Sequence, residues 1–450
     1  MRKKKTGKLI GLKILLILCA LCLSSAFNAC RAPDKVSDNP SVIFPVLTPP
    51  GRIPDDGTVD PNNPDGGGET PNPDGTANPN NPNGSETPDP DGGGTETPRG
   101  QGTGTADDPF RIYNADDLDA LRKRENFAAN SDTTNHHFYY ALQNDVELPG
   151  PTDGELSNFT PIEKFYGTLD GGGFAVRNLC IDKTLVLGGD ASGDRPAAFI
   201  LAVERNAEVK NLTVEIGSVA GSAAAAIACE NRGKITACTV SPYTSPSAVS
   251  GGILGLGASG TCGGIAAKNY GEISDCVNYA PITAPEPIAC AGGIAGDTND
   301  IGDDYGAGKI LRCVNKGAIE CNAAHVGGIT GTAGPGAVIS RCVNLGTVTD
   351  TGSDYVGGIA GFDVTGMFGS ATPNAGIIEC VSAGNLIAEA RPNVGAIVGG
   401  TDGPPLSGFS RVVDCYTVSD AEGLETVLRA IGMWDMPAFI IVWQNNTFLI

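Results

Sequence analysis

Short apolar stretches, separated by glycine or polar turns, fill most of the chain after residue 105. They lack the length and the 3.6-residue spacing of amphipathic helices, so they predict β-strands. The exception lies near the start of this region. Residues 110–113 and 137–142 are predicted strands, and residues 114–127 are a predicted helix that Asn114 caps.

An internal repeat organises these stretches. A four-residue frame, aliphatic-x-x-(Leu or Cys), recurs eight times and ends at Leu179, Leu212, Cys238, Cys276, Cys313, Cys342, Cys380 and Cys415. Gly-Gly-Ile or a relative precedes most frames, at 251–253, 263–265, 292–294, 327–329, 357–359 and 395–397. A unit of three short strands cannot bury its own apolar face and must stack on copies of itself. The pattern predicts an all-β fold, a right-handed parallel β-helix solenoid of about eight coils.

The repeat also predicts what fills the solenoid. Six cysteines occupy the position that Leu179 and Leu212 hold in the first coils, so we expect buried thiols that act as small hydrophobes. Disulfides between neighbouring coils are the alternative. Asn278, Asn315 and Asn344 follow two residues after their cysteines and share their parity, which predicts an inward ladder of side-chain amides.

Some of these motifs resemble those of a known family. Residues 326–331 (Val-Gly-Gly-Ile-Thr-Gly) and 356–361 (Val-Gly-Gly-Ile-Ala-Gly), with the recurring Cys-Val-Asn, resemble the GLUG motif of bacterial surface proteins. Residues 165–173 resemble the first coil of such proteins, and the two Trp residues resemble their C-terminal ending. The resemblance covers about residues 105–450 and implies a surface β-helix. Such repeats occur on adhesin-like proteins and beside immunoglobulin-cleaving peptidase domains, but His-Glu-x-x-His is absent from this sequence.

The N-terminal region predicts export. A basic start and the apolar run 9–27 predict a signal peptide over residues 1–29. Residues 27–30 (Phe-Asn-Ala-Cys) resemble a bacterial lipobox, which implies lipidation of Cys30 and anchoring to a membrane. Cleavage without a lipid and an uncleaved anchor are the alternatives. Residues 30–105, rich in Pro, Gly, Asp and Asn, predict a disordered linker.

The folded body divides into three predicted parts. Residues 106–175 form an N-terminal strand-helix cap and the first coil, and residues 176–418 form the GLUG-like repeats. Residues 419–450 form a C-terminal cap, because an open last coil exposes a β edge that invites aggregation. The predicted location is the bacterial cell envelope, lipid-anchored and surface-exposed.

Composition narrows the partners. The 450 residues include 30 Lys and Arg against 51 Asp and Glu, a net charge of -21, which disfavours nucleic acid as a ligand. Three histidines are too few for a zinc site. One acidic cluster offers oxygen ligands for calcium, but it lacks the register of a known calcium loop and a solvated loop is the simpler interpretation. The cluster consists of Asp297, Asp300, Asp303 and Asp304. We predict no cofactor and no metal.

Insertions point to one corner of the solenoid as the binding site. The distance from the Gly-Gly-Ile isoleucine to the next frame varies from 8 to 18 residues. The distance from the cysteine of a frame to the next such isoleucine stays at 16 to 18 residues from Cys276 onward. Loops on one side of a solenoid commonly bind ligands. The predicted contacts are the acidic cluster with Tyr305, Phe362, Phe368 and Phe409. Alternatively, these rings cover their own loops. His325 aligns with Cys290 and Tyr355 and is predicted to be structural.

These observations predict a non-catalytic, adhesin-like binding protein with an extracellular protein or glycan ligand. A polysaccharide lyase or glycoside hydrolase on a β-helix is the first alternative, and a structural envelope spacer is the second. Acidic residues with basic partners on one face of consecutive coils would favour the enzyme.

Overall fold

The computed structural model describes residues 102–130, 137–152, 155–184, 195–244, 251–299, 307–366, 374–388, 393–401, 411–419, 442–444 and 447–449. All of them belong to the unit Asp91–Ile450. The predicted signal peptide, Cys30 and nearly all of the predicted linker lie outside the described residues, as does most of the predicted C-terminal cap.

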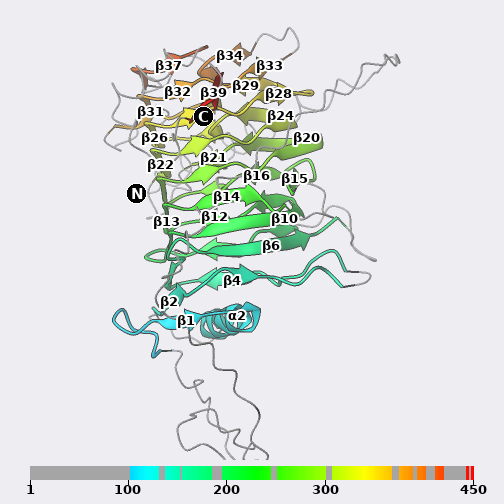
Figure 1. Cartoon of the computed structure of the whole chain (residues 1–450). Coiled ribbons are helices and arrows are strands. Elements are labelled where there is room, and N and C mark those ends of the chain that lie inside the picture. The colour runs from blue at the N-terminus through cyan, green and yellow to red at the C-terminus, as the bar shows by residue number, and fades with distance from the viewer. Residues whose placement is uncertain are drawn as a thin grey trace, which may run out of the picture. The chain divides into compact units, whose positions relative to one another are not determined.

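Within the described part of the chain, three parallel sheets stack coil upon coil (Figure 1). Sheet A contains β1 (Phe110–Ile112), β2 (Tyr139–Leu142), β5 (Thr168–Asp170), β9 (Glu208–Lys210), β13 (Lys234–Thr236), β18 (Glu272–Ser274), β22 (Lys309–Leu311), β26 (Val338–Ser340), β31 (Gly376–Ile378) and β36 (Val412–Val413). Sheet C contains β4 (Ile162–Phe165), β8 (Ile200–Val203), β12 (Ala228–Asn231), β17 (Ala266–Asn269), β21 (Ala295–Thr298), β25 (Thr330–Ala333), β30 (Ala360–Asp363) and β35 (Val398–Thr401).

Sheet B lies between them in the chain order of each coil. It contains β3 (Val146–Glu147), β6 (Ala175–Asp182), β7 (Pro196–Ala197), β10 (Thr213–Gly221), β11 (Ala223–Ala225), β14 (Thr239–Pro242), β15 (Ile253–Gly255), β16 (Thr261–Gly263), β19 (Val277–Asn278), β20 (Ile282–Gly292), β23 (Val314–Asn315), β24 (Ile319–Gly327), β27 (Val343–Asn344), β28 (Val348–Asp350), β29 (Tyr355–Gly357), β32 (Val381–Ser382), β33 (Leu386–Ile387), β34 (Val394–Gly395) and β37 (Tyr416–Thr417). A separate antiparallel hairpin pairs β38 (Val442–Gln444) with β39 (Thr447–Leu449). The architecture is the predicted all-β parallel β-helix.

A helix, α2 (Ala115–Asn130), lies beside β4 at the N-terminal end of the stack (Figure 1). The amide of Asp117 donates to the Asn114 side-chain oxygen at 2.9 Å, so Asn114 caps the helix as predicted. Leu118 and Leu121 are buried. The buried Glu125 carboxylate accepts a hydrogen bond from the Tyr140 hydroxyl at 2.7 Å, which ties the helix to sheet A.

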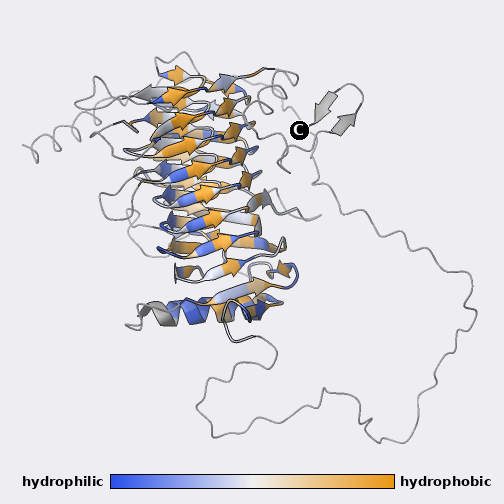
Figure 2. Ribbon diagram, turned by 90° about the vertical axis from the view of Figure 1, so that its left-hand side faces the viewer, coloured by the Kyte–Doolittle hydropathy of each residue, from blue (hydrophilic) through white to orange (hydrophobic). Residues whose placement is uncertain are grey.

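Apolar side chains fill the interior of the stack. Hydrophobic residues, coloured orange in Figure 2, recur in strands from coil to coil. The cysteines at 238, 276, 313, 342 and 380 are buried and unpaired, which confirms the predicted thiol column, and Cys415 is half-buried. Each thiol donates to the carbonyl two residues earlier, as Cys276 does to Ser274 at 3.2 Å. Burial raises the pKa of the Cys276 and Cys342 thiols well above their ordinary value, so both remain protonated.

A left-handed residue turns the chain from sheet A into sheet B. In seven frames the residue before the terminal Leu or Cys makes this turn, with a φ between 51° and 57°; these are Asn211, Ala237, Asp275, Arg312, Arg341, Glu379 and Asp414. Asn178, before Leu179 of the first frame, is also left-handed, with a φ of 59°, but it lies within β6 of sheet B. The prediction for the first frame is wrong. Val176 pairs with Val214 in sheet B, and it is Leu169 that pairs with Val209 in sheet A. A glycine turn at 171–173 replaces the single left-handed residue there, which shifts the apolar pattern.

The asparagine ladder is confirmed. Nδ2 of Asn278 donates to Oδ1 of Asn315 at 3.0 Å, and Nδ2 of Asn315 donates to Oδ1 of Asn344 at 2.9 Å. All three side chains are fully buried. A second pair, from Asn231 to Asn269 at 2.9 Å, stacks in sheet C and was not predicted.

The ladder explains the second glycine of Gly-Gly-Ile. A Cβ on Gly293 would lie 2.3 Å from the Asn315 side chain, and one on Gly328 would lie 2.3 Å from that of Asn344. The two sequence motifs are therefore one packing unit. The prediction for 251–253 is wrong, because Ile253 lies within sheet B, and the true equivalent in the coil before residues 263–265 is Ala-Ala-Ile at 225–227.

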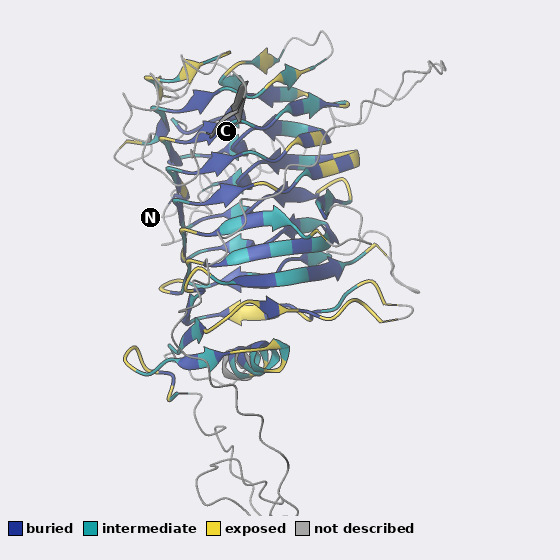
Figure 3. Ribbon diagram, in the orientation of Figure 1, coloured by how far each residue is buried: buried dark blue, intermediate teal, exposed yellow. Residues whose placement is uncertain are grey.

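The last described coil is the least covered. Residues of β34 to β37 are half-buried or exposed (Figure 3). Residues 420–441, the greater part of the predicted C-terminal cap, lie outside the described residues.

Candidate functional site

Two of the predicted site residues lie on strands. Asp297 is in β21 and Phe362 is in β30, with Thr332 of β25 paired between them in register. The prediction placed both in loops and is wrong, because the strand of sheet C continues past each Gly-Gly-Ile turn before the insertion begins. The remaining predicted contacts, Asp300, Asp303, Asp304, Tyr305, Phe368 and Phe409, lie outside the described residues.

Asp297 and Phe362 belong to a cluster at the corner between sheets B and C. Nδ1 of His325 lies 2.8 Å from Oγ1 of Thr332, and Sγ of Cys290 lies 3.2 Å from the same oxygen. The Phe362 ring stacks on the His325 ring with centroids 4.7 Å apart. This ring therefore packs against β24 of sheet B.

The cluster combines a thiol, an imidazole and a carboxylate, but its chemistry is that of packing. Burial, with Asp297 nearby, raises the pKa of Cys290 to about 12, and a nucleophilic cysteine needs a thiolate. Burial also raises the pKa of Asp297 to about 6, although Lys268 on the adjacent strand opposes this. Among the described residues, no group of three or more His, Cys, Asp or Glu side chains is placed to hold a metal ion.

A groove of about 580 Å³ lies at another corner, where strands of sheet C turn into sheet A. Its wall includes the turns at 205–207, 232–233 and 270–271 and the residues Ala307 and Lys309. Three consecutive coils have short connections here: counted from equivalent positions, Val209 follows Phe199 by ten residues, Ile235 follows Ile227 by eight, and Ile273 follows Ile265 by eight. The next coil needs 16 residues. The groove thus lies at the same corner of the solenoid as the insertions, but in coils whose connections are short.

Basic side chains dominate the groove. It is lined by Arg205, Lys210, Arg232, Lys234 and Lys309, against Glu208 and Glu272. The chain as a whole has the opposite balance, with 30 basic and 51 acidic residues. One outward position of sheet A pairs in register across four strands and holds Glu208, Lys234, Glu272 and Lys309.

These cations differ in how they are held. Arg232 bonds to Glu204 at 3.2 Å and to Glu230 at 2.5 Å, so its charge is already matched. Lys210 lies 3.6 Å from Glu208. Lys234 and Lys309 are exposed, and no carboxylate of the described residues is within ion-pair distance of either ammonium group.

Aromatic rings complete the groove. His137 and Tyr139 have ring centroids 4.9 Å apart, and Nε2 of His137 lies 3.0 Å from Oγ1 of Thr168. Tyr270 is buried at the wall, and burial raises its pKa to about 12. Among the residues that the structure describes, the lining contains no Leu, Ile, Val, Met, Phe or Trp. The sequence prediction missed these residues. The sequence did hold a signal for them. In four successive frames a charged residue directly precedes the first aliphatic residue; these are Glu208, Lys234, Glu272 and Lys309.

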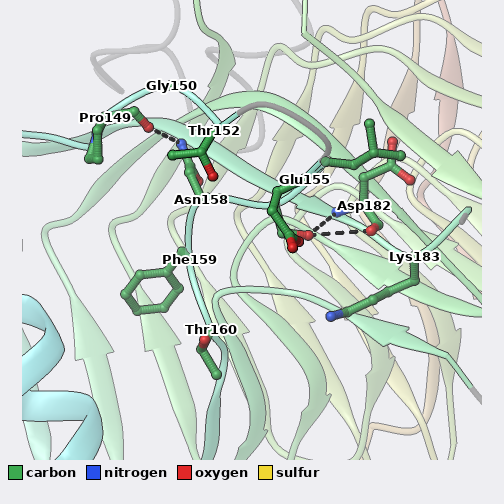
Figure 4. A pocket seen from close by; sticks show the side chains of 11 residues that line it. Pro149, Gly150, Thr152, Glu155, Asn158, Phe159, Thr160, Asp182 and Lys183 are labelled. Atoms are coloured by element: carbon green, nitrogen blue, oxygen red, sulfur yellow. Dashed lines mark hydrogen bonds between the residues drawn. The ribbon is translucent and has the colours of Figure 1, made fainter. Parts of the chain in front are cut away.

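A second cavity of about 550 Å³ lies beside β6, lined by residues 149–160 in part and by Asp182 and Lys183 (Figure 4). Nδ2 of Asn158 donates to the Pro149 carbonyl at 2.8 Å, and the amide of Asp182 donates to Oγ of Ser157 at 3.0 Å. Several of its polar groups thus bond to one another. We assign no ligand to it.

Comparison with known proteins gives limited likenesses. No family model matches the sequence. Halomucin from Haloquadratum walsbyi (strain DSM 16790 / HBSQ001) is 33% identical over 124 residues, which is 27% of this chain and 1% of halomucin. The chain therefore spans about a hundredth of the length of that relative.

Two solved structures are similar in arrangement. A provisionally assigned immunoglobulin A1 protease from Bacteroides ovatus has 18% identity and a TM-score of 0.46, over 77% of this chain and 92% of that one. An IgA1 protease has 16% identity and a TM-score of 0.41, over 68% of this chain and 21% of that one. At these values neither likeness supports an activity for this chain. Among the described residues, no helix is long and apolar enough to cross a bilayer.

Proposed function

We propose that the chain is a lipid-anchored, surface-displayed β-helix binding protein of adhesin type, without catalytic activity, whose extracellular ligand lies in the groove between sheets C and A. The observation that carries the proposal is the groove itself. It is open, lined by charged side chains of which Lys234 and Lys309 are exposed and by the half-buried rings of His137 and Tyr139, and set on a stack of paired strands. A site on rigid strands is preorganised and loses little conformational freedom on binding.

The anchor part of the proposal rests on the sequence. Residues 27–30 resemble a lipobox, and the acidic, Pro-rich and Gly-rich stretch 30–105 is suited to hold the folded unit away from a membrane. The GLUG-like repeats support display at a bacterial surface. Lipidation would occur at Cys30.

A second candidate function has its own observation. Glu208 and Glu272 flank Lys234 on one face of consecutive coils, which is the arrangement that favours a polysaccharide-degrading enzyme. Two strand spacings place their Cα atoms roughly 10 Å apart. Inverting glycosidases separate their carboxylates by about 6.5–9.5 Å. Release of reducing ends from polysaccharides by the full chain, lost in Glu208→Gln, would establish the enzyme instead.

The test of the proposed function is a groove-filling substitution. The full chain is applied to an array of glycans and matrix proteins beside Glu272→Trp, which places a large ring in the middle of the groove. Glu320→Trp, at an exposed position of β24 in sheet B, is the matched control. We expect Glu272→Trp to abolish binding that the parent and the control retain. Equal binding by all three proteins would contradict the proposal.

A further inference from the structure

We propose that the groove binds a linear anionic polysaccharide, carboxylated or sulfated, through contacts of its acid groups with Lys234 and Lys309. This inference rests on the proposed function and specifies its ligand. Lys234 and Lys309 are equivalent residues of sheet A, each paired in register with Glu272. They are thus two strand spacings apart along the stack, or roughly 10 Å.

The spacing suits a repeating polymer. A linear polysaccharide presents acid groups at regular intervals along an extended chain. A row of equivalent side chains along a solenoid presents its charges at regular intervals as well. A ligand lying parallel to the stack meets Lys234 and Lys309 in turn, across the strands rather than along them.

The charge state of the groove favours an anionic ligand. Lys234 and Lys309 are exposed, and no described carboxylate is within ion-pair distance of their ammonium groups, whereas Arg232 is held between Glu204 and Glu230. Binding an acid group at these two lysines therefore breaks no ion pair among the described residues. Glu272 between them repels an acid group at that point, so the row favours ligands whose charges are separated.

The lining favours a sugar over a protein. Protein interfaces are held mainly by a few well-packed hot-spot side chains, most often Trp, Tyr and Arg in desolvated pockets. Among the described residues that line the groove there is no Trp, Tyr270 is buried, and Arg232 is already paired with two glutamates, whereas the rings of Tyr139 and His137 are partly accessible. Rings of this kind stack on the apolar faces of sugars while the hydroxyls remain hydrated. The paired strands of sheet A leave no free backbone row in the middle of the groove to which a peptide strand can add.

Nucleic acid, which is also a polyanion, is disfavoured by the rest of the molecule. The net charge of -21 repels polyanions outside the groove, and it repels most strongly a polymer as densely charged as duplex DNA, which carries one charge per about 1.7 Å of its axis. The stiff, densely charged duplex cannot confine its charge to one narrow row. A flexible polysaccharide with spaced acid groups can.

The experiment compares matched pairs of polymers and variants of the full chain. The probes are dextran sulfate against neutral dextran, polygalacturonate against its neutral methyl ester, and duplex DNA. The variants are Lys234→Gln/Lys309→Gln and Glu272→Gln. Their controls are Lys164→Gln/Lys183→Gln, with the same loss of charge elsewhere, and Glu320→Gln. Affinities are measured by biolayer interferometry at about 50 mM and about 500 mM NaCl, which changes the Debye length about threefold.

We expect binding to at least one of the two charged polysaccharides and not to its neutral partner. The Lys234→Gln/Lys309→Gln variant should bind roughly ten-fold more weakly, from two surface contacts of a few-fold each. Glu272→Gln should bind about two-fold to five-fold more tightly, since a repulsive charge is removed, and high salt should weaken binding. The controls should match the parent.

Several results overturn the inference. One is an unchanged affinity in Lys234→Gln/Lys309→Gln, and another is an equal fall in affinity in Lys164→Gln/Lys183→Gln. DNA binding as tight as polysaccharide binding, or no binding to either charged polysaccharide, would overturn it as well. Capture of only neutral glycans or proteins, lost in Glu272→Trp, would overturn the anionic ligand and leave the proposed function standing. Retention of that capture in Glu272→Trp would overturn both.

Discussion

Replacing Asn315 by valine tests the ladder that joins the two sequence motifs. Asn315 accepts from Asn278 at 3.0 Å and donates to Asn344 at 2.9 Å. It also donates to the carbonyl of Gly317 at 3.0 Å and accepts from the amide of Gly317 at 3.2 Å. Valine has a suitable volume, because Val240 holds the same column one coil below Asn278. The substitution therefore removes four buried hydrogen bonds without opening a large cavity.

The expected cost follows from those bonds. A buried hydrogen bond contributes about 1 kcal/mol, and the groups that lose their partners add to the cost, so Asn315→Val should lower the free energy of unfolding by about 4 kcal/mol. Asn278→Val loses three such bonds, because its lower neighbour is Val240, and should cost about 3 kcal/mol. The exposed Asn385 provides a control, since its replacement by alanine should change stability by less than about 0.5 kcal/mol.

Urea denaturation of the full chain, followed by circular dichroism, measures these differences. The midpoints should fall in the order Asn385→Ala, Asn278→Val, Asn315→Val. If Asn315→Val unfolds at the same urea concentration as Asn385→Ala, the amide stack does not stabilise the solenoid and the reasoning is refuted.

Four other outcomes are expected. Cys313→Leu should melt near the parent temperature, whereas Cys313→Asp buries an unpaired charge and should unfold the central coils; equal melting would show that the thiol column is not inward. Burial raises the pKa of Asp297 from 3.8 to about 6, so its ionisation lowers the free energy of unfolding as the pH rises through this range. Asp297→Asn should remove about 1–2 kcal/mol of this pH dependence, measured by urea titrations at several pH values. The same pH dependence in Asp297→Asn and the parent would contradict the prediction. Gly328→Ala should cost about 1–3 kcal/mol, because its Cβ meets the ladder and the next backbone, whereas Gly150→Ala, with open space, should not alter the melting temperature. Cys30→Ala should abolish labelling by a fatty-acid probe and release the chain into the medium, and persistent labelling would place the anchor at another cysteine.

The repeat pattern carried enough information to predict the solenoid, because inward positions recur at fixed offsets from each cysteine. It failed at Leu179, where a glycine turn at 171–173 changes the spacing and two registers fit the apolar pattern equally well. It also failed at Asp297 and Phe362, since counting residues between motifs does not separate the strand from the loop that follows.

The groove was missed for a different reason. Lys234 and Lys309 are far apart in the chain and look like ordinary solvated residues, although each directly precedes the first aliphatic residue of its frame. The register of sheet A shows that they stand in one row, with Glu272 between them. The corner was predicted from loop lengths, but the open part of that corner belongs to the coils without insertions.

The most direct test of ligand binding in the groove is lysine protection. The full chain is acetylated briefly with and without dextran sulfate and with and without polygalacturonate, and the modified peptides are quantified by mass spectrometry. Lys234 and Lys309 should lose reactivity with the polysaccharide that binds, while the exposed Lys164 of β4 keeps it. Protection of Lys164 with Lys234 and Lys309 fully reactive would contradict the assignment of the groove as the binding site.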